Sequence, residues 1–190
     1  MPRCFFCVPI AAEAARPLAA FAESEFPRWL TGWRLSLIGE ADLHLTLRFF
    51  PEAEGERLPA LEQALPMLAE TTAPLALRAE RVAIWPTVRQ ARVVVALIEG
   101  GEALAPVASA AEAIARHLGY DAEQRPFRAH LTLARVRAPG ALPRASPPRP
   151  PPIAIAAQAV ALWESLPSGS ARRYRERLRA AFSGGEAGAV

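Results

Sequence analysis

Apolar residues recur along the chain in two different patterns. Three segments carry them at every third or fourth position, which predicts helices: residues 11–29, 56–70 and 102–119. Other segments alternate apolar with polar residues or form short apolar runs, which predicts strands: residues 4–10, 34–39, 42–50, 75–85, 91–99, 127–136 and 155–166. Residues 171–182 fit an amphipathic helix as well as an alternating strand.

The order of these elements has an approximate two-fold repeat, which indicates a duplication-like pair of lobes within one domain over residues 1–182. The proline-rich residues 139–152 should be an extended surface connection, because proline cannot donate to a sheet ladder. The glycine-rich residues 183–190 should form a flexible tail.

The tetrapeptide His-Leu-Thr-Leu occurs twice, at residues 44–47 and 130–133, in a chain with three histidines. Because side chains alternate across a strand, the histidine and the threonine share one face and both leucines point to a core. One such strand would favour a structural histidine, and threonine is a common strand residue. Two copies in corresponding places instead favour a shared catalytic site.

Two histidines on either side of one site suit phosphodiester cleavage. Histidine titrates near neutrality, so one imidazole can act as base and another as acid. Thr46 and Thr132 would donate hydrogen bonds to the phosphate oxygens, where negative charge develops. We favour His130 as base and His44 as acid, and the similarity of the two motifs leaves the opposite assignment open.

Composition adds an indication of an anionic ligand. All 22 basic residues are arginine and the net charge is +3; the planar guanidinium suits phosphate because it can donate two parallel hydrogen bonds. No apolar run approaches the roughly 20 residues of a membrane-spanning helix. We therefore expect no membrane association, and we take a cytoplasmic monomer as the default.

The two cysteines, Cys4 and Cys7, form a C-x-x-C pair within a predicted strand. A zinc site needs about four ligands, and no second Cys/His cluster completes one. Positions i and i+3 of a strand point to opposite faces, which disfavours a thioredoxin-like pair. We expect buried, inert thiols.

The paired H-x-T-x motifs, with Arg135 five residues after His130, "RCFFCVPI" at the start and "LWESLPSGSARRYRERL" near the end, resemble the 2H (two-histidine) phosphoesterase superfamily. Within it, the chain is similar over residues 3–182 to RNA 2',3'-cyclic phosphodiesterases, also called 2'-5' RNA ligase-like proteins. The resemblance implies an α+β, bilobal, pseudo-two-fold fold, with two antiparallel sheets flanking a central cleft, helices outside, and a strand at residues 171–182.

The resemblance also implies the reaction. Family members hydrolyse a ribose 2',3'-cyclic phosphate to a 2'-phosphate without metal or nucleotide cofactor, and some join RNA ends reversibly through 2'-5' bonds without ATP. It makes His44 and His130 catalytic, with Thr46, Thr132 and Arg135 binding the phosphate. The partners would be RNA ends or nucleotides with a 2',3'-cyclic phosphate. One departure is Phe49-Phe50-Pro51, where the family usually has Phe-Leu-Gly.

Other functions stay open at this level. The substrate could be ADP-ribose 1'',2''-cyclic phosphate or another small cyclic ester, and the chain could be a non-catalytic RNA-end binding module. A histidine-based metal hydrolase has no carboxylate or H-x-x-x-H spacing to support it. The positions with open roles are Arg48 as the analogue of Arg135, Phe5 and Phe6 as stacking rings or core, and Arg172, Arg173 and Arg175 as phosphate ligands or a solvated face.

Overall fold

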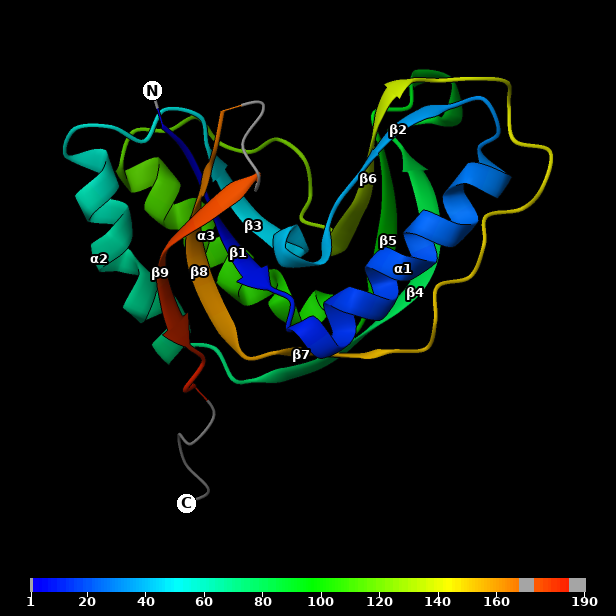
Figure 1. Ribbon diagram of the computed structural model, residues 1–190. Helices are drawn as coiled ribbons and strands as arrows, with labels where there is room; N and C mark the ends of the chain where they lie inside the picture. Colours follow the sequence, from blue (N-terminus) through cyan, green and yellow to red (C-terminus); the bar gives the residue numbers. More distant parts are fainter. Residues whose placement is uncertain (1, 168–172, 185–190) are drawn as a thin grey trace.

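The computed structural model describes residues 2–167 and 173–184 (Figure 1). Its helices are α1 (Ala12–Trp29), α2 (Arg57–Glu70) and α3 (Ala105–His117), with 3-10 turns at Glu40–Asp42, Val88–Gln90 and Gly101–Leu104. Its strands are β1 (Arg3–Pro9), β2 (Arg34–Leu37), β3 (His44–Phe50), β4 (Leu75–Trp85), β5 (Val93–Glu99), β6 (His130–Ala138), β7 (Ala154–Ala157), β8 (Ala159–Ser165) and β9 (Tyr174–Ala181). The three predicted helices are confirmed, and the ambiguous residues 171–182 contain a strand.

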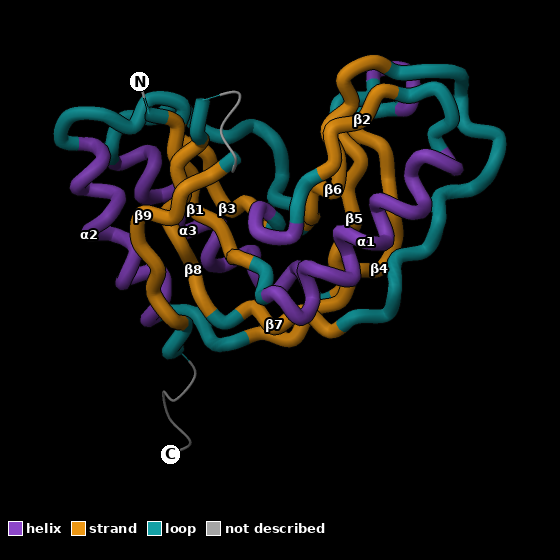
Figure 2. Tube along the Cα trace, viewed as in Figure 1, coloured by secondary structure: helices purple, strands orange, loops and turns teal. Residues whose placement is uncertain are grey.

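The described strands form one antiparallel sheet of nine, in the order β7-β4-β5-β6-β3-β1-β8-β9, with β2 also paired to β6. Figure 2 shows the two groups of strands on either side of the junction between β3 and β6. Their register is defined by one residue pair, Leu45 opposite Leu131, which we call the junction leucines. The α+β class is confirmed, and the two sheets expected from the resemblance are two halves of one continuous sheet.

The predicted strand over residues 155–166 is wrong in one respect, because it is two strands in different halves. β7 pairs with β4, whereas β8 pairs with β1. Gln158 separates them, and its carbonyl accepts a hydrogen bond from the backbone N–H of Phe182 at 2.8 Å. The apolar pattern runs on because both strands are buried, so it gives no sign that the chain changes partners.

All three helices pack on the face of the sheet that carries the motif leucines. α1 packs against β2 and β6, α3 against β3, and α2 against β8 and β9. The junction leucines, Leu47 and Leu133 are all buried in this core. The histidines and threonines of the motifs lie partly exposed on the other face. The predicted alternation of the two motifs is therefore confirmed.

The proline-rich residues 139–152 form neither helix nor strand, as predicted. Two of their carbonyls, on Ala141 and Ala145, accept hydrogen bonds from the indole N–H groups of Trp33 (2.8 Å) and Trp29 (3.0 Å). This connection is therefore fastened to the region of α1.

The predicted tail is described only at its first two residues. Ser183 and Gly184 donate backbone hydrogen bonds to the carbonyls of Ala69 (3.1 Å) and Thr72 (2.9 Å) at the end of α2. Residues 185–190 of the predicted tail lie outside the described residues. Within the part of the chain that the structure describes, no helix combines the length and the apolar character needed to cross a membrane.

Because one core spans both halves, truncating a junction leucine should weaken the whole molecule. Leu131 is 0% exposed, and Leu131→Ala should lower the free energy of unfolding by about 2–5 kcal/mol. Urea unfolding should show one transition, moved to lower denaturant. The control Leu142→Ala, at a side chain that is 57% exposed, should change the free energy by less than about 0.5 kcal/mol. Equal effects of the two substitutions would contradict this account of the core.

Candidate active site

The register of β3 and β6 brings the two motifs together. Counting one residue in either direction from the junction leucines places His44 level with Thr132 and Thr46 level with His130. In an antiparallel pair, opposed Cβ atoms are about 4.5–5.5 Å apart and diagonal neighbours about 7–8 Å apart. The two imidazoles therefore lie on one diagonal, each beside the threonine of the other motif.

A β-bulge follows each motif and changes the face on which the next residues lie. The pairing of β1 with β3 skips Leu47, and the pairing of β5 with β6 skips Leu133. An extra residue reverses the phase of the alternation beyond it. The residue five positions after each histidine, which simple alternation would place among the leucines, therefore returns to the histidine face.

In the second motif, that residue is Arg135. Its side chain is exposed, and one guanidinium nitrogen, Nη2, donates to the hydroxyl of Tyr174 at 3.0 Å. Its positive charge is one of the causes that lower the pKa of His44. The structure thus brings Arg135 to the same surface as the four motif side chains. Strand periodicity alone would have placed it on the opposite face.

In the first motif, the corresponding residue is Phe49, and the interpretation of Arg48 as the analogue of Arg135 is wrong. Phe49 is 39% exposed, with its ring centroid 6.5 Å from that of Phe5 on the histidine face. Arg48 turns to the helix side, where its Nε lies 2.5 Å from the carboxylate of Glu112. The two bulges thus give the pseudo-symmetric site one arginine and one aromatic ring.

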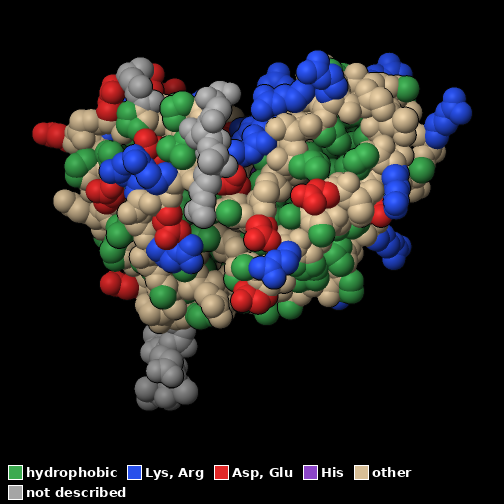
Figure 3. All heavy atoms as spheres, in the orientation of Figure 1, with side chains coloured by type: hydrophobic (Ala, Val, Ile, Leu, Met, Phe, Trp, Pro, Cys, Tyr) green, Lys and Arg blue, Asp and Glu red, His purple; other side chains and the backbone are tan. Residues whose placement is uncertain are grey.

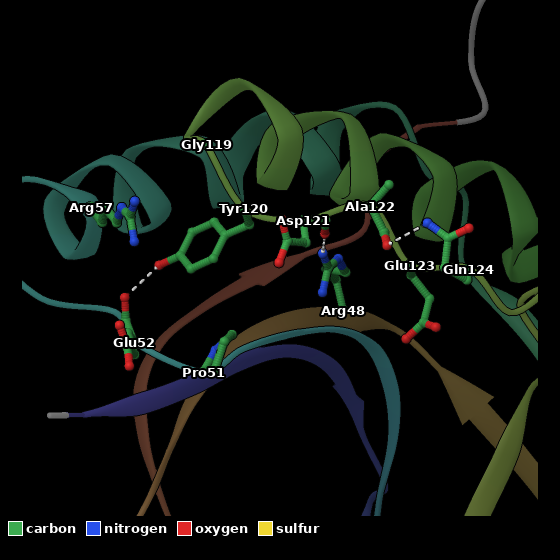
Figure 4. Close-up of a pocket in the computed structure, with 10 residues that line it drawn as sticks. All are labelled: Arg48, Pro51, Glu52, Arg57, Gly119, Tyr120, Asp121, Ala122, Glu123 and Gln124. Carbon is green, nitrogen blue, oxygen red and sulfur yellow. Dashed lines mark hydrogen bonds between the residues drawn. The ribbon is translucent and has the colours of Figure 1, made fainter.

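Two cavities among the described residues lie near the sheet, one on the helix side and one beside the strand positions next to His130. One, of about 380 Å³, is lined by Arg48, Arg57, Tyr120 and Glu123 among others (Figure 4). A second, of about 280 Å³, includes Arg128 in its lining. Neither lining includes the motif histidines or threonines, but the second includes Leu97, which is paired opposite His130.

The two imidazoles are held by matching hydrogen bonds. His44 Nδ1 lies 2.7 Å from the carbonyl oxygen of Asp42, and His130 Nδ1 lies 2.8 Å from that of Arg128. Because a carbonyl can only accept, Nδ1 carries the hydrogen in both rings. Each Nε2 is then a lone-pair acceptor in the neutral ring and a donor in the charged ring, as general base and acid catalysis require.

Both imidazoles have a lowered pKa in the protein without substrate. Burial lowers the pKa of His44 from 6.5 to about 4, assisted by the charges of Arg135 and His130 and opposed by the carbonyl of Asp42. The pKa of His130 is also lowered, first by burial and then by the charges of Arg128 and Arg125. Both rings are therefore neutral near neutral pH.

Aromatic rings surround the histidines and account for this loss of solvation. The ring centroid of His44 lies 4.8 Å from Phe5, 5.0 Å from Tyr174 and 5.2 Å from Trp163. That of His130 lies 4.6 Å from Trp85. Sequence reasoning missed these tryptophans and the tyrosine, because the residues of one strand do not reveal which other strand lies beside it in the sheet.

Strand β1 divides its side chains between the two faces. Phe5 and Cys7 belong to a small cluster with Trp163 on the histidine face, whereas Cys4 and Phe6 lie in the main core. The prediction of buried, separated thiols is confirmed. Phe5, for which either a stacking ring or a core role was considered, is buried and also borders the site.

The arginines before and within β9 make structural contacts. The backbone N–H of Arg173 donates to the carboxylate of Asp42 at 3.2 Å, and its guanidinium donates to Ser36 Oγ at 2.6 Å. Arg175 pairs with Glu164 at 2.7 Å. Arg173 therefore ties the start of β9 to the residue that orients His44. Arg172 lies outside the described residues.

Comparisons with known proteins agree with this arrangement. Residues 8–95 match the family model of the LigT like phosphoesterases. The RNA 2',3'-cyclic phosphodiesterase of Bacillus subtilis strain 168 is 25% identical over 138 residues, which is 70% of this chain and 71% of that protein.

Among the described residues, no group of three His, Cys, Asp or Glu side chains could hold a metal ion.

Solved structures extend the likeness to the second motif. The protein TT0787 of Thermus thermophilus superposes with a TM-score of 0.76 at 27% identity, over 96% of this chain and 98% of that chain. LigT of E. coli complexed with 3'-AMP gives 0.74 at 25% identity, over 96% and 99%. The resemblance to the 2H phosphoesterase superfamily is thus confirmed in sequence and fold.

The half-buried imidazole of His44 should make stability depend on pH. Its folded pKa, about 4, lies below the unfolded value of 6.5, so the unfolded chain binds more protons between these values and acid favours unfolding. Relative to His44→Gln, the wild type should lose on the order of 2 kcal/mol as pH falls through this window, allowing for the partial exposure of the ring. Urea unfolding at a series of pH values measures the difference, and parallel curves would contradict the shift.

Proposed function

We propose that the protein hydrolyses the 2',3'-cyclic phosphate of RNA ends or nucleosides to a 2'-phosphate, with His44 and His130 as the acid/base pair and without a metal ion. The observation that carries the proposal is the matching orientation of the two imidazoles. They stand on adjacent strands, and each has Nδ1 hydrogen-bonded to a backbone carbonyl, so that Nε2 is the nitrogen that would transfer the proton.

The reaction needs one proton taken and one given. The base, for which we favour His130, removes a proton from water through Nε2 as the water oxygen attacks phosphorus. The bond from phosphorus to O3' breaks, and the acid, His44, delivers its Nε2 proton to that oxygen. The products are a 2'-phosphate and a 3'-hydroxyl, and the protonation states of the two rings are exchanged.

The acid must acquire its proton when substrate binds. A phosphate anion beside the rings favours the charged imidazole and raises its pKa, opposing the effect of burial. Thr46 and Thr132 would donate hydrogen bonds to the non-bridging oxygens, and Arg135 would balance the charge that develops on them. Substrate binding is thus what makes acid catalysis possible in a site where both rings are otherwise neutral.

Relatives support the substrate class. The Bacillus subtilis relative is named for hydrolysis of RNA 2',3'-cyclic phosphate, and E. coli LigT is complexed with 3'-AMP, a nucleotide with a phosphate on the ribose. With an RNA 5'-hydroxyl in place of water, the same base would remove the proton of that hydroxyl and the same acid would protonate O3', which gives a 2'-5' bond without ATP. In the reverse reaction, where O3' attacks and the 5'-hydroxyl leaves, the two histidines would exchange roles.

Removing either imidazole should abolish most turnover. With EDTA present, the wild type should convert 2',3'-cyclic AMP and a short RNA ending in a cyclic phosphate to 2'-phosphates. His44→Ala and His130→Ala should each lose roughly 100-fold or more in kcat/KM, as loss of general acid/base catalysis predicts. Chromatography of the products and circular dichroism of the variants are the measurements.

His117→Ala is the matched control, because this exposed histidine on α3 lies on the helix side of the sheet. It should retain full turnover. A folded wild type that hydrolyses neither substrate would overturn the proposal, and full activity of either motif variant would remove that histidine from the mechanism. Comparable turnover of ADP-ribose 1'',2''-cyclic phosphate would extend the substrate class to small cyclic esters.

A sulfur leaving group separates the acid from the base. A cyclic phosphorothiolate with sulfur in place of O3' departs as a thiolate that needs no proton, because thiols have a pKa of about 8.5. It should restore turnover to His44→Ala but not to His130→Ala. Rescue of His130→Ala alone would reverse the two assignments, and the ratio of the rates on the two substrates measures the effect.

A further inference from the structure

Four exposed arginines gather at one end of β2, β5 and β6. Arg34 begins β2, Arg137 lies near the end of β6, Arg92 precedes β5, and Arg89 is in the turn between β4 and β5. We call these four residues the arginine strip. They come from three separate stretches of the sequence, so only the fold assembles them.

Backbone pairing shows that the strip is continuous with the candidate site. Ser36 is opposite Arg135, and two residues earlier Arg34 is opposite Ala138, beside Arg137. On the other side of β6, the carbonyl of Arg92 accepts the backbone N–H of Val136 at 2.9 Å. The strip thus begins within two residues of Arg135, the arginine that borders the motif histidines.

Alternation directs two members of the strip to the histidine face. Leu35 and Val136, which are paired with each other, pack against the main core on the helix side. Their neighbours Arg34 and Arg137 therefore point to the other face, as Arg135 does. A charged surface thus runs from the phosphate-binding residues towards the end of β6.

The charge of the strip is not compensated by neighbouring carboxylates. Within the described ranges, 2–167 and 173–184, none of its arginines forms an ion pair, whereas those of β9 do. The sequence holds no acidic residue between positions 81 and 98 or between 124 and 163. Figure 3 shows basic side chains gathered over the upper ends of β2 and β6. Such a single-sign surface attracts polyanions.

We propose that the arginine strip binds the backbone phosphates of a single-stranded RNA whose 2',3'-cyclic end occupies the histidine site. The proposal rests on the proposed function and deepens it, because it makes RNA a better substrate than a mononucleotide. A mononucleotide has no phosphates to reach the strip, whereas an oligonucleotide extends past Arg135 along it. Guanidinium groups suit this contact through their paired donors.

The test compares two double variants that each remove two positive charges. Arg34→Gln/Arg137→Gln alters the strip, and Arg28→Gln/Arg116→Gln alters exposed arginines on α1 and α3. The strip variant should lose about twofold to fivefold per arginine in kcat/KM on a short oligoadenylate with a cyclic end, as expected for exposed charge pairs. It should turn over 2',3'-cyclic AMP like the wild type, and the control should resemble the wild type on both substrates.

Binding provides a readout that does not depend on catalysis. Fluorescence anisotropy with a labelled oligoadenylate ending in a 2'-phosphate gives Kd over a range of salt concentrations. The slope of log Kd against log salt should fall by roughly 0.7 for each phosphate that the strip variant no longer neutralises, and it should stay unchanged in the control. If the wild type cleaves neither cyclic substrate, the proposed function fails and this measurement still decides the strip. Equal losses on oligonucleotide and mononucleotide, or equal salt slopes in the two variants, would overturn the proposal.

Discussion

The contact between the two motif strands at Leu45 and Leu131 is the interaction on which the rest of the molecule depends. It buries both leucines in the core shared by the three helices. Because a strand has two faces, the same contact must set the two His-Thr pairs side by side on the other face. Core packing and assembly of the candidate site are therefore one event. A register slip of one residue would separate the histidines and expose the leucines together.

Beyond that contact, the two bulges decide which residues complete the site. They occur at equivalent leucines, Leu47 and Leu133, and shift the phase of both strands in the same way. The outcome differs because the sequence places Phe49 at one of the shifted positions and Arg135 at the other. A pseudo-symmetric backbone thus supports an asymmetric surface, with a cation beside one motif and a ring beside the other. Such asymmetry suits a reaction whose two imidazoles must hold different protonation states.

The reach of sequence reasoning follows from the same geometry. Periodicity was sufficient for the helices, for the two-sided strand β1 and for the faces of the two tetrapeptides, since each depends only on residues nearby in the chain. It failed where strand partners or phase matter. Residues 155–166 change partner at Gln158 without a break in pattern, Arg48 is displaced by a bulge, and Trp163 joins the site only because β8 lies beside β1. Arg135 was found through family resemblance, which encodes a bulge that periodicity does not.

Charge is arranged differently at short and at long range from the histidines. Close to the imidazoles, aromatic rings remove water, and the nearby cation Arg135 adds to the penalty on a protonated ring, so the free site rests in a neutral state. Farther out, the arginine strip lies in solvent, where charge acts mainly through attraction over about one Debye length of roughly 8–10 Å. An anion drawn along the strip would reach the two neutral imidazoles, and its arrival would supply the field that protonates one of them. Because the uncompensated arginines lie outside the ring of aromatics, the strip would attract the proposed RNA substrate while adding little to the penalty on the protonated imidazole that acid catalysis requires.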